Sequence, residues 1–341
     1  MKILVTGGTG YIGSHTVVEL QQQGFEVVIV DNLSNSQAGV VDSIKKITGI
    51  RPHFEQFDLA NSDKTSEFFR RHYDIKGVIH FAAFKAVGES VEKPLLYYRN
   101  NLVSLMNILD SMIANNVQNL VFSSSCTVYG QPDELPVSEN APIKKAESPY
   151  GNTKQISEEI LQDTIRSSKI QTIALRYFNP IGAHETALIG ELPLGIPNNL
   201  VPFITQTAIG LRQQLSVFGD NYNTPDGTAI RDYIHVVDLA KAHVVAVTRM
   251  IEDKMKEPFE VFNLGTGNGY SVLDVIKSFE KVSGQKLNYK IVDRRAGDVE
   301  KVWADSTFSN EELGWKASKE LDEMTASAWK WEKAYRAKVS Q

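Results

Sequence analysis

Short apolar runs alternate with longer amphipathic runs through the first half of the chain. The apolar runs read KILVT, FEVVIVD, HFEQFDL, KGVIHFAA, NLVFSSS and QTIALRYF, and each has the length of a buried strand. The runs between them, among them YIGSHTVVELQQQ and the segments near residues 62–72 and 94–115, have helical spacing. Apolar strands separated by helices indicate a parallel sheet covered on both faces. The pattern predicts an α/β, doubly wound fold.

The pattern changes after Phe178. Residues 179–202 are rich in glycine and proline, which predicts a long loop that leaves the sheet, and long ordered loops usually serve function. Further strand-like and helix-like segments follow without a flexible linker, near residues 200–213, 228–236, 238–255, 259–264, 271–283 and 319–336. We predict one domain over residues 1–178 and a smaller C-terminal α/β lobe over residues 179–341, with some chain crossing between the two.

The composition is that of an ordinary globular protein, with 341 residues of which 42% are hydrophobic and 23% charged. A net charge of -5 gives no reason to expect a nucleic-acid partner. The single cysteine, Cys126, excludes an intrachain disulfide and suits a reducing cytoplasm, and we interpret it as a small buried side chain. The N-terminal apolar run is too short for a signal peptide, and no run reaches membrane-spanning length. We expect a cytoplasmic protein with no membrane partner, and we predict no metal site.

A glycine-rich stretch, TGGTGYIG, stands between the first predicted strand and the first predicted helix. It contains G-x-G-x-x-G at Gly8, Gly10 and Gly13, and also the spacing G-x-x-G-x-x-G, which begins at Gly7. Glycines permit a tight turn and a close approach of a pyrophosphate, and the helix N-terminus offers free N–H groups. The strand–turn–helix setting favours a dinucleotide site over a purely structural glycine turn.

The second predicted strand ends at Asp31, twenty-one residues after Gly10. A carboxylate at this position accepts hydrogen bonds from the adenosine ribose hydroxyls. It would repel the ribose phosphate of NADP, and no arginine follows in the stretch Asn32 to Asn35 to offset that repulsion. The sequence predicts NAD as the cofactor and the first domain as an NAD-binding Rossmann domain.

Ligands of such sheets lie outside the carboxyl ends of the strands, so the residues at the other strand ends are further candidates. They are Asp58 and Leu59 at the third strand, Phe81, Ala82 and Ala83 at the fourth, Ser123, Ser124 and Ser125 at the fifth, and Phe178 and Asn179 at the sixth. Tight packing accounts for the small residues among them equally well.

The stretch SPYGNTKQ predicts a helix whose first turn lies just after the fifth strand. Ser148 is a good N-cap and Pro149 fits the first helical position, so Tyr150 and Lys154 lie four residues apart on one helix face. The Lys154 ammonium and the positive nicotinamide ring would both lower the tyrosine pKa, and a pKa lower by ~2 corresponds to roughly 2.7 kcal/mol. The arrangement predicts Tyr150 as a general base for a hydroxyl, with Ser125 bonded to the same oxygen. Without its context, the pair would be an exposed helical pair.

Eight stretches together resemble the UDP-glucose 4-epimerases, members of the extended short-chain dehydrogenase/reductase family. They are TGGTGYIG, KAVGES, SSSCTVYG, SPYGNTK, RYFNPIGAH, GIPNNL, DGTAIRDYIHVVDLA and RRAGD, and they extend over almost the whole chain. The glycine motif is shared by very many enzymes, whereas KAVGES, GIPNNL and RDYIHVVDLA in this order are far more specific.

The resemblance implies a role for each matching residue. Ser125, Tyr150 and Lys154 match the catalytic set. The cofactor contacts it implies, together with those read from the glycine turn and the strand ends, are Gly7, Gly10, Tyr11, Ile12, Gly13, Asp31, Asn32, Asn35, Ser36, Asp58, Leu59, Phe81, Ala82, Lys85, Asn100, Ser123, Tyr150, Lys154 and Phe178. The UDP-sugar contacts are Ser125, Tyr150, Asn179, Asn199, Leu200, Phe218, Arg231, Tyr233, Arg295, Asp298 and Val302.

A diphosphate needs cations, and the planar guanidinium groups of Arg231 and Arg295 suit it. Apart from the resemblance, surface salt bridges with Asp232 or Asp298 would explain both arginines. The implied reaction passes a hydride from sugar C4 to NAD and back to the other face of a 4-keto sugar. NAD should therefore remain bound through turnover, and the family is typically homodimeric.

Two positions depart from the family pattern. Cys126 stands where a small apolar residue is usual beside the catalytic serine, which we expect to be tolerated. Val302 stands where some members carry a tyrosine that crowds the sugar pocket, so acceptance of UDP-N-acetylglucosamine and UDP-N-acetylgalactosamine is a hypothesis.

The alternative activities are another NAD-dependent nucleotide-sugar oxidoreductase or a dehydratase. Dehydratases of this fold usually carry an Asp-Glu pair after the strand-end serine or threonine, whereas Cys126 and Thr127 stand here. A second alternative is a redox sensor that binds NAD without turnover, but such proteins generally lose the tyrosine or the lysine.

Overall fold

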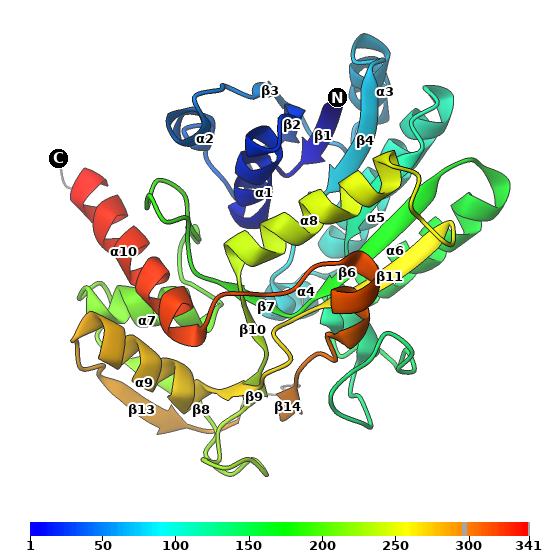
Figure 1. The fold of residues 1–341 in the computed structure, drawn as a ribbon. Coiled ribbons are helices and arrows are strands. Elements are labelled where there is room, and N and C mark those ends of the chain that lie inside the picture. The colour runs from blue at the N-terminus through cyan, green and yellow to red at the C-terminus, as the bar shows by residue number, and fades with distance from the viewer. Residues whose placement is uncertain (295–298, 340–341) are drawn as a thin grey trace.

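The computed structural model describes residues 1–294 and 299–339, and its centre is a seven-stranded parallel sheet (Figure 1). The strand order is β3-β2-β1-β4-β5-β6-β11, which is a Rossmann arrangement and confirms the predicted doubly wound fold. The strands are β1 (Lys2–Thr6), β2 (Glu26–Asp31), β3 (His53–Gln56), β4 (Ile75–His80), β5 (Asn119–Ser123), β6 (Gln171–Tyr177) and β11 (Phe259–Leu264).

Helices cover both faces of this sheet because successive strand residues point to opposite sides. In β1, Ile3 and Val5 pack into one apolar cluster and Leu4 packs into the other. The first face is covered by α1 (Tyr11–Gln22), α2 (Val40–Thr48) and α8 (Val236–Ile251). The second is covered by α3 (Ser62–Arg71), α5 (Pro94–Ala114) and α6 (Pro149–Ser167), with the short α4 (Val87–Glu92) beside α5 and α6.

Several strands end earlier than the apolar pattern predicts. β3 ends at Gln56, so Asp58 and Leu59 belong to the following loop. Likewise β4 ends at His80, before Phe81 and Ala82. The physical reason is that the chain must leave the sheet before the next helix begins. In the loop after β3, the Asp58 carboxylate accepts a hydrogen bond from the main-chain N–H of Ala60 at 2.8 Å, which stabilises this turn.

The second half of the chain does not all leave the sheet. β11 pairs in parallel with β6 as a seventh strand, and α8 packs against α1, β4, β5 and β6. The division at residue 178 stays a prediction, with α8 and β11 as the segments that cross back. Among the described residues, no helix is long and apolar enough to cross a bilayer.

The remaining elements form a smaller layer around a separate apolar cluster, which includes Ile204, Val217, Phe279 and Trp329. Its helices are α7 (Leu200–Ala208), α9 (Val272–Ser283) and α10 (Leu321–Val339), and the short helical turns elsewhere are η1 (Cys126–Tyr129) and η2 (Ser309–Leu313). Its strands are β7 (Asn179–Ile181), β8 (Leu215–Phe218), β9 (Ile230–Arg231), β10 (Tyr233–His235), β12 (Tyr270–Ser271), β13 (Tyr289–Val292) and β14 (Lys301–Val302). The predicted loop of residues 179–202 therefore starts with a short strand.

Candidate active site

The glycine-rich turn joins β1 to α1 at the carboxyl edge of the large sheet. Gly7 has a φ of +69°, and a Cβ there would lie 2.9 Å from the main-chain nitrogen of Ala82. A Cβ at Gly13 would collide with the carbonyl oxygen of Gly7. Gly10 is the N-cap of α1 and has no side chain to occupy the first-turn N–H groups. The turn thus offers main-chain donors in a space that only glycines leave open.

The Asp31 carboxylate lies beside this turn, at the end of β2. It accepts hydrogen bonds from the main-chain N–H groups of Thr9 at 3.2 Å and Leu33 at 2.9 Å. The Ser36 hydroxyl lies 3.3 Å from the same carboxylate and 2.7 Å from the Thr9 hydroxyl. These contacts fix a buried negative charge where the sequence places the ribose.

Lys85 approaches Glu191, a residue that the sequence analysis did not identify. The Lys85 Nζ lies 3.4 Å from the Glu191 Oε1 and 5.9 Å from the centroid of the Tyr11 ring. The same Oε1 accepts a hydrogen bond from the Asn199 side chain at 2.6 Å. The Tyr11 hydroxyl donates to the carbonyl of Gly182 at 2.6 Å. Glu191 therefore links a predicted cofactor residue, Lys85, to a predicted substrate residue, Asn199.

The other cofactor candidates lie mostly in the segments that follow the strands. The main-chain nitrogen of Phe81 donates to the Thr6 carbonyl at 3.1 Å, and that of Ala82 lies 3.4 Å from the Thr6 hydroxyl. These contacts hold the loop after β4 against β1. Cofactor binding stays a prediction for this whole set, which comprises Ile12, Asn32, Asn35, Asp58, Leu59, Phe81, Ala82, Asn100 and Phe178.

The predicted helix start at Ser148 is confirmed. The Ser148 side chain accepts a hydrogen bond from the Gly151 N–H at 3.1 Å, and α6 begins at Pro149. Tyr150 and Lys154 are both buried, with 8% and 4% of their surface exposed. This burial contradicts an exposed helical pair.

Lys154 and Ser125 are held by the end of β5. The Lys154 Nζ donates to the main-chain carbonyl of Ser123 at 2.6 Å, and the Ser123 hydroxyl lies 2.6 Å from the Tyr177 hydroxyl. Ser125 is the N-cap of η1 and accepts from the Thr127 N–H at 3.2 Å. The fold therefore brings the three predicted catalytic side chains to one strand end.

The surroundings of Tyr150 in the chain act on its pKa in the direction opposite to the one expected from Lys154 and the nicotinamide ring, and the lowering in the presence of that ring stays a prediction. Burial raises the pKa of Tyr150 well above 10, with Tyr177 adding to the rise and hydrogen bonding to Ser125 opposing it. Burial also lowers the pKa of Lys154 to about 8, while Glu158 opposes that change. Desolvation is the largest cause of both shifts because both groups are enclosed.

Two short strand pairings gather four of the predicted substrate residues. Tyr233 of β10 pairs with Asn179 of β7, and Val302 of β14 pairs with Arg231 of β9. Arg231 and Tyr233 flank Asp232 in the chain, so the two pairings are adjacent.

Asp232 itself is fully buried. Its carboxylate accepts from the main-chain N–H groups of Thr266 at 2.8 Å and Gly267 and Ala304, both at 3.1 Å. This burial argues against the alternative of a surface salt bridge between Arg231 and Asp232.

The other substrate candidates lie farther along the smaller layer. Asn199 precedes α7 and Leu200 is its first residue, while Phe218 is the last residue of β8. Arg295 and Asp298 lie outside the described residues. The UDP-sugar contacts therefore stay predictions.

A buried ion pair behind Lys154 was also missed by the sequence analysis. Arg176 donates to both oxygens of Glu158, at 3.0 and 2.5 Å, and the Ser124 hydroxyl donates to the same carboxylate at 2.5 Å. Glu158 follows Lys154 by four residues on α6, so helical spacing could have identified it. Glu191 gave no such signal, because Lys85 is 106 residues away and Asn199, eight residues away, lies outside any regular element that both share.

Comparison with known proteins agrees with this geometry. Residues 4–328 match the family model described as GDP-mannose 4,6 dehydratase. A UDP-glucose 4-epimerase of Mus musculus is 49% identical over 339 residues, which cover 97% of this chain and 96% of the mouse protein.

Two solved structures show the same fold over nearly the full length. A UDP-glucose 4-epimerase from Stenotrophomonas maltophila, with bound NAD and formylated UDP-arabinopyranose, has a TM-score of 0.95, 47% identity and 99% coverage of both chains. The enzyme from Bifidobacterium longum, in complex with NAD+ and UDP, has a TM-score of 0.94 and 45% identity, and covers 98% of this chain and 99% of its own. The chain belongs to the UDP-glucose 4-epimerase family.

Proposed function

We propose that this protein is an NAD-dependent UDP-glucose 4-epimerase, which interconverts UDP-glucose and UDP-galactose by inverting sugar C4. The observation that carries the proposal is the enclosed arrangement of Ser125, Tyr150 and Lys154 at the end of β5, in the same parallel sheet whose β1 leads into the glycine-rich turn. The relatives described above support it, since they carry the same activity in their names.

The glycine turn and Asp31 fit NAD. Close approach at Gly7 and Gly13 leaves room for a pyrophosphate against the main chain, and the N-terminus of α1 complements its charge. The Asp31 carboxylate is held by Thr9 and Leu33, so it is oriented as an acceptor for ribose hydroxyls. A ribose phosphate there would meet a fixed negative charge, which favours NAD over NADP.

The chemistry that NAD supplies when bound is acceptance and return of the hydride at sugar C4, so that C4 passes through a ketone with no net redox change. Tyr150 takes the C4 hydroxyl proton and later returns it. Because burial makes its phenolate costly, Lys154 must be charged and near for the base to form. Ser125 donates to the phenolate and orients it.

The nucleotide must stay anchored while the 4-keto sugar rotates, because the hydride has to return to the opposite face of the C4 ketone. We propose that Arg231 supplies positive charge for the diphosphate and that Asn199 contacts the ligand. We also propose that Val302, which is small and 8% exposed, leaves space for an N-acetyl group. The protein would then accept UDP-N-acetylglucosamine and UDP-N-acetylgalactosamine as well.

We further propose a cytoplasmic homodimer. The free thiol of Cys126 supports a reducing compartment. Apolar side chains on α5 support association, with Leu95 65%, Leu96 43%, Met106 42% and Ile113 47% exposed. Molar mass measured by light scattering after gel filtration tests this, and a 38.0 kDa species at all concentrations would contradict it.

A dehydratase remains the second candidate because the matching family model is described by that activity. Elimination of water from the sugar needs an acid and a base after the strand-end serine. The residues there are Cys126 and Thr127, and burial raises the pKa of the Cys126 thiol to about 12. This favours epimerisation.

The decisive experiment adds UDP-galactose to the purified protein without added NAD and follows nucleotide sugars by NMR. We expect UDP-glucose to accumulate to equilibrium with no net NADH, which also tests the retained cofactor. A 4-keto-6-deoxy product would favour the dehydratase. No conversion after NAD is supplied would contradict the proposed function.

A further inference from the structure

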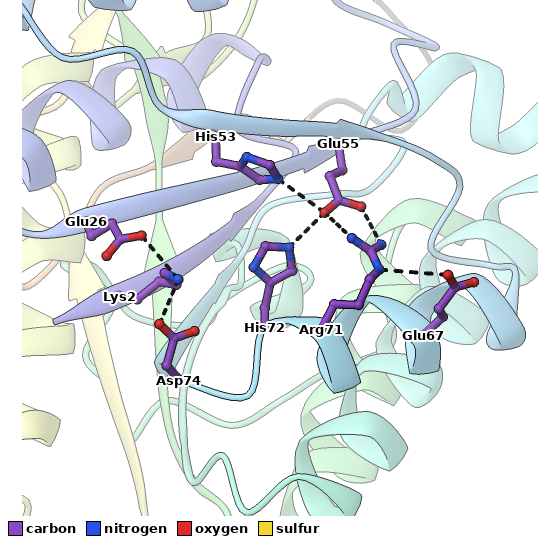
Figure 2. A network of polar contacts seen from close by, with 8 residues as sticks. All are labelled: Lys2, Glu26, His53, Glu55, Glu67, Arg71, His72 and Asp74. Atoms are coloured by element: carbon purple, nitrogen blue, oxygen red, sulfur yellow. Dashed lines mark hydrogen bonds and ion pairs between the residues drawn. The ribbon is translucent and has the colours of Figure 1, made fainter.

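A cluster of three side chains that could hold a metal ion lies at the amino ends of the strands of the large sheet, away from the candidate active site. His53 begins the edge strand β3 and Glu55 lies two residues later, on the same face, while His72 follows α3. Figure 2 shows the two imidazoles converging on the Glu55 carboxylate. His53 is the first residue of β3, and His72 precedes the first residue of β4. Both histidines therefore lie at the amino ends of these strands, whereas the candidate active site lies at the carboxyl ends of the sheet.

The three side chains are already arranged around a common point. The His72 Nε2 lies 2.7 Å from the Glu55 Oε1, and the His53 Nε2 lies 3.2 Å from the same oxygen. Their ligand atoms all lie within 4.8 Å of one another. Two tetrahedral zinc ligands with bonds of 2.0–2.1 Å are separated by about 3.3 Å, so only small side-chain movements are needed.

Packing orients part of this cluster and leaves the rest open to solvent. The His72 ring lies 4.5 Å from the Phe68 ring, centroid to centroid, and its side chain is 14% exposed. Glu55 is 18% exposed, whereas His53 is 56% exposed. An ion can therefore enter from the His53 side and meet two ligands that are held in place.

We propose that His53, Glu55 and His72 bind a divalent transition-metal ion of the zinc class, with water completing the coordination. Two imidazole nitrogens and one carboxylate oxygen suit Zn²⁺, and they are softer than the all-oxygen sets that Mg²⁺ and Ca²⁺ prefer. This inference departs from the sequence analysis, which predicted no metal site. It does not depend on the proposed function.

Arg71 is the group that opposes this ion. Its guanidinium donates to both Glu55 oxygens, at 2.8 and 2.7 Å, and its Nε lies 3.8 Å from Glu67. Metal binding would require Oε1 to turn from Arg71 to the ion, with the positive guanidinium left close to a second positive charge. The competing cation weakens the site, so removing it should strengthen metal binding.

The test is titration of the purified full-length protein with Zn²⁺ by calorimetry and with Co²⁺ by visible absorption. We expect one ion per chain and the visible bands of four-coordinate cobalt. His53→Gln and His72→Gln should each weaken Zn²⁺ binding at least tenfold and abolish those bands. Arg71→Gln should tighten binding several-fold.

Glu67→Gln is the matched control, since it removes a carboxylate next to Arg71 without removing a proposed ligand. It should leave the Zn²⁺ affinity within about twofold of the original protein. Because His53 is exposed, its variant should fold even if the His72 variant does not, and thermal melts without metal check both. Absence of the cobalt bands in the original protein, or unchanged Zn²⁺ binding in a folded His53→Gln variant, would overturn the proposal.

Discussion

The Nζ of Lys154 donates a hydrogen bond to the main-chain carbonyl of Ser123 at 2.6 Å. This contact ties the first turns of α6 to the end of β5, and the ammonium also lies 4.8 Å from the centroid of the Phe122 ring. The lysine is thus positioned by the end of β5.

Replacing Tyr150 by phenylalanine removes the proposed base with little change in shape. We expect kcat to fall by about a thousandfold, within the usual range for general acid–base catalysis, and UDP binding to change little. Steady-state kinetics and calorimetry with UDP measure the two effects. Tyr98→Phe, which removes a hydroxyl on the neighbouring α5, should retain activity. A Tyr150→Phe variant with nearly full kcat would rule out this tyrosine as the base.

Replacing Glu158 by glutamine should move the alkaline limb of the pH–kcat profile to lower pH. The pKa of Lys154 is lowered to about 8 by burial, and Glu158 opposes that lowering. Without this carboxylate the ammonium deprotonates more easily, so the charged form that the reaction needs is lost at lower pH.

The profile is measured with folded protein well below its melting temperature, because Arg176 loses a buried partner and stability should fall by about 3 kcal/mol or more. The exposed Glu159, next along α6, gives the matched control Glu159→Gln. An unchanged alkaline limb in the Glu158 variant would contradict the role given to Lys154.

Replacing Glu191 by glutamine should weaken ligand binding more than it slows chemistry. The Glu191 carboxylate accepts from Asn199 and faces Lys85, so glutamine loses the charge that attracts the proposed cofactor residue and keeps a single, weaker acceptor oxygen for the proposed substrate residue. We expect a KM for the UDP-sugar raised about tenfold and partial loss of retained NAD, with kcat changed less than threefold. The measurements are kinetics and the NAD content of purified protein. The exposed Glu185 supplies a control. If Glu185→Gln raised KM and lowered the NAD content equally, the role proposed for Glu191 would be contradicted.

Replacing Val302 by tyrosine should restrict the sugar pocket. Val302 is buried on β14 opposite Arg231, so a larger side chain there has to project into neighbouring space. We expect activity on UDP-N-acetylgalactosamine to fall at least 100-fold while activity on UDP-galactose falls less than tenfold. NMR of both reactions compares them directly. Inability of the original protein to convert either acetylated sugar would refute the hypothesis before the variant is made.

Acid should destabilise this protein through buried histidines. Burial lowers the pKa of His243 and His235 to about 4, and that of His15 and His80 to about 3. The unfolded chain therefore binds more protons than the folded one below about pH 6.5, so this stability is fully present above pH 6.5 and is lost as pH falls toward 4. For His243 the shift corresponds to about 3 kcal/mol.

Denaturant unfolding at several pH values between 7.5 and 4.5 measures this slope. His243→Gln should flatten the pH dependence. An equal slope in the His243 variant and the original protein would show that other groups cause the acid sensitivity.

The sequence alone determined the features that depend on short stretches of chain. Alternating apolar runs predicted the parallel sheet, glycines before α1 predicted a dinucleotide turn, and Ser148 with Pro149 marked the start of α6. Such signals are readable because periodicity, caps and glycine conformations act over a few residues. The strand ends were less well predicted. Apolar residues continue past β3 to Leu59, although the pairing of β3 with β2 ends at Gln56.

Only the tertiary structure decided what distant segments do together. In the structure β11 pairs with β6. The sequence could not predict this pairing, because the apolar pattern of a buried strand does not say which strand lies next to it. The tertiary structure joined Glu191 to Lys85 and Asn199, and it brought His72 to His53 and Glu55. It also showed that burial raises the pKa of Tyr150, since burial is a property of the packed chain that helical spacing alone does not reveal.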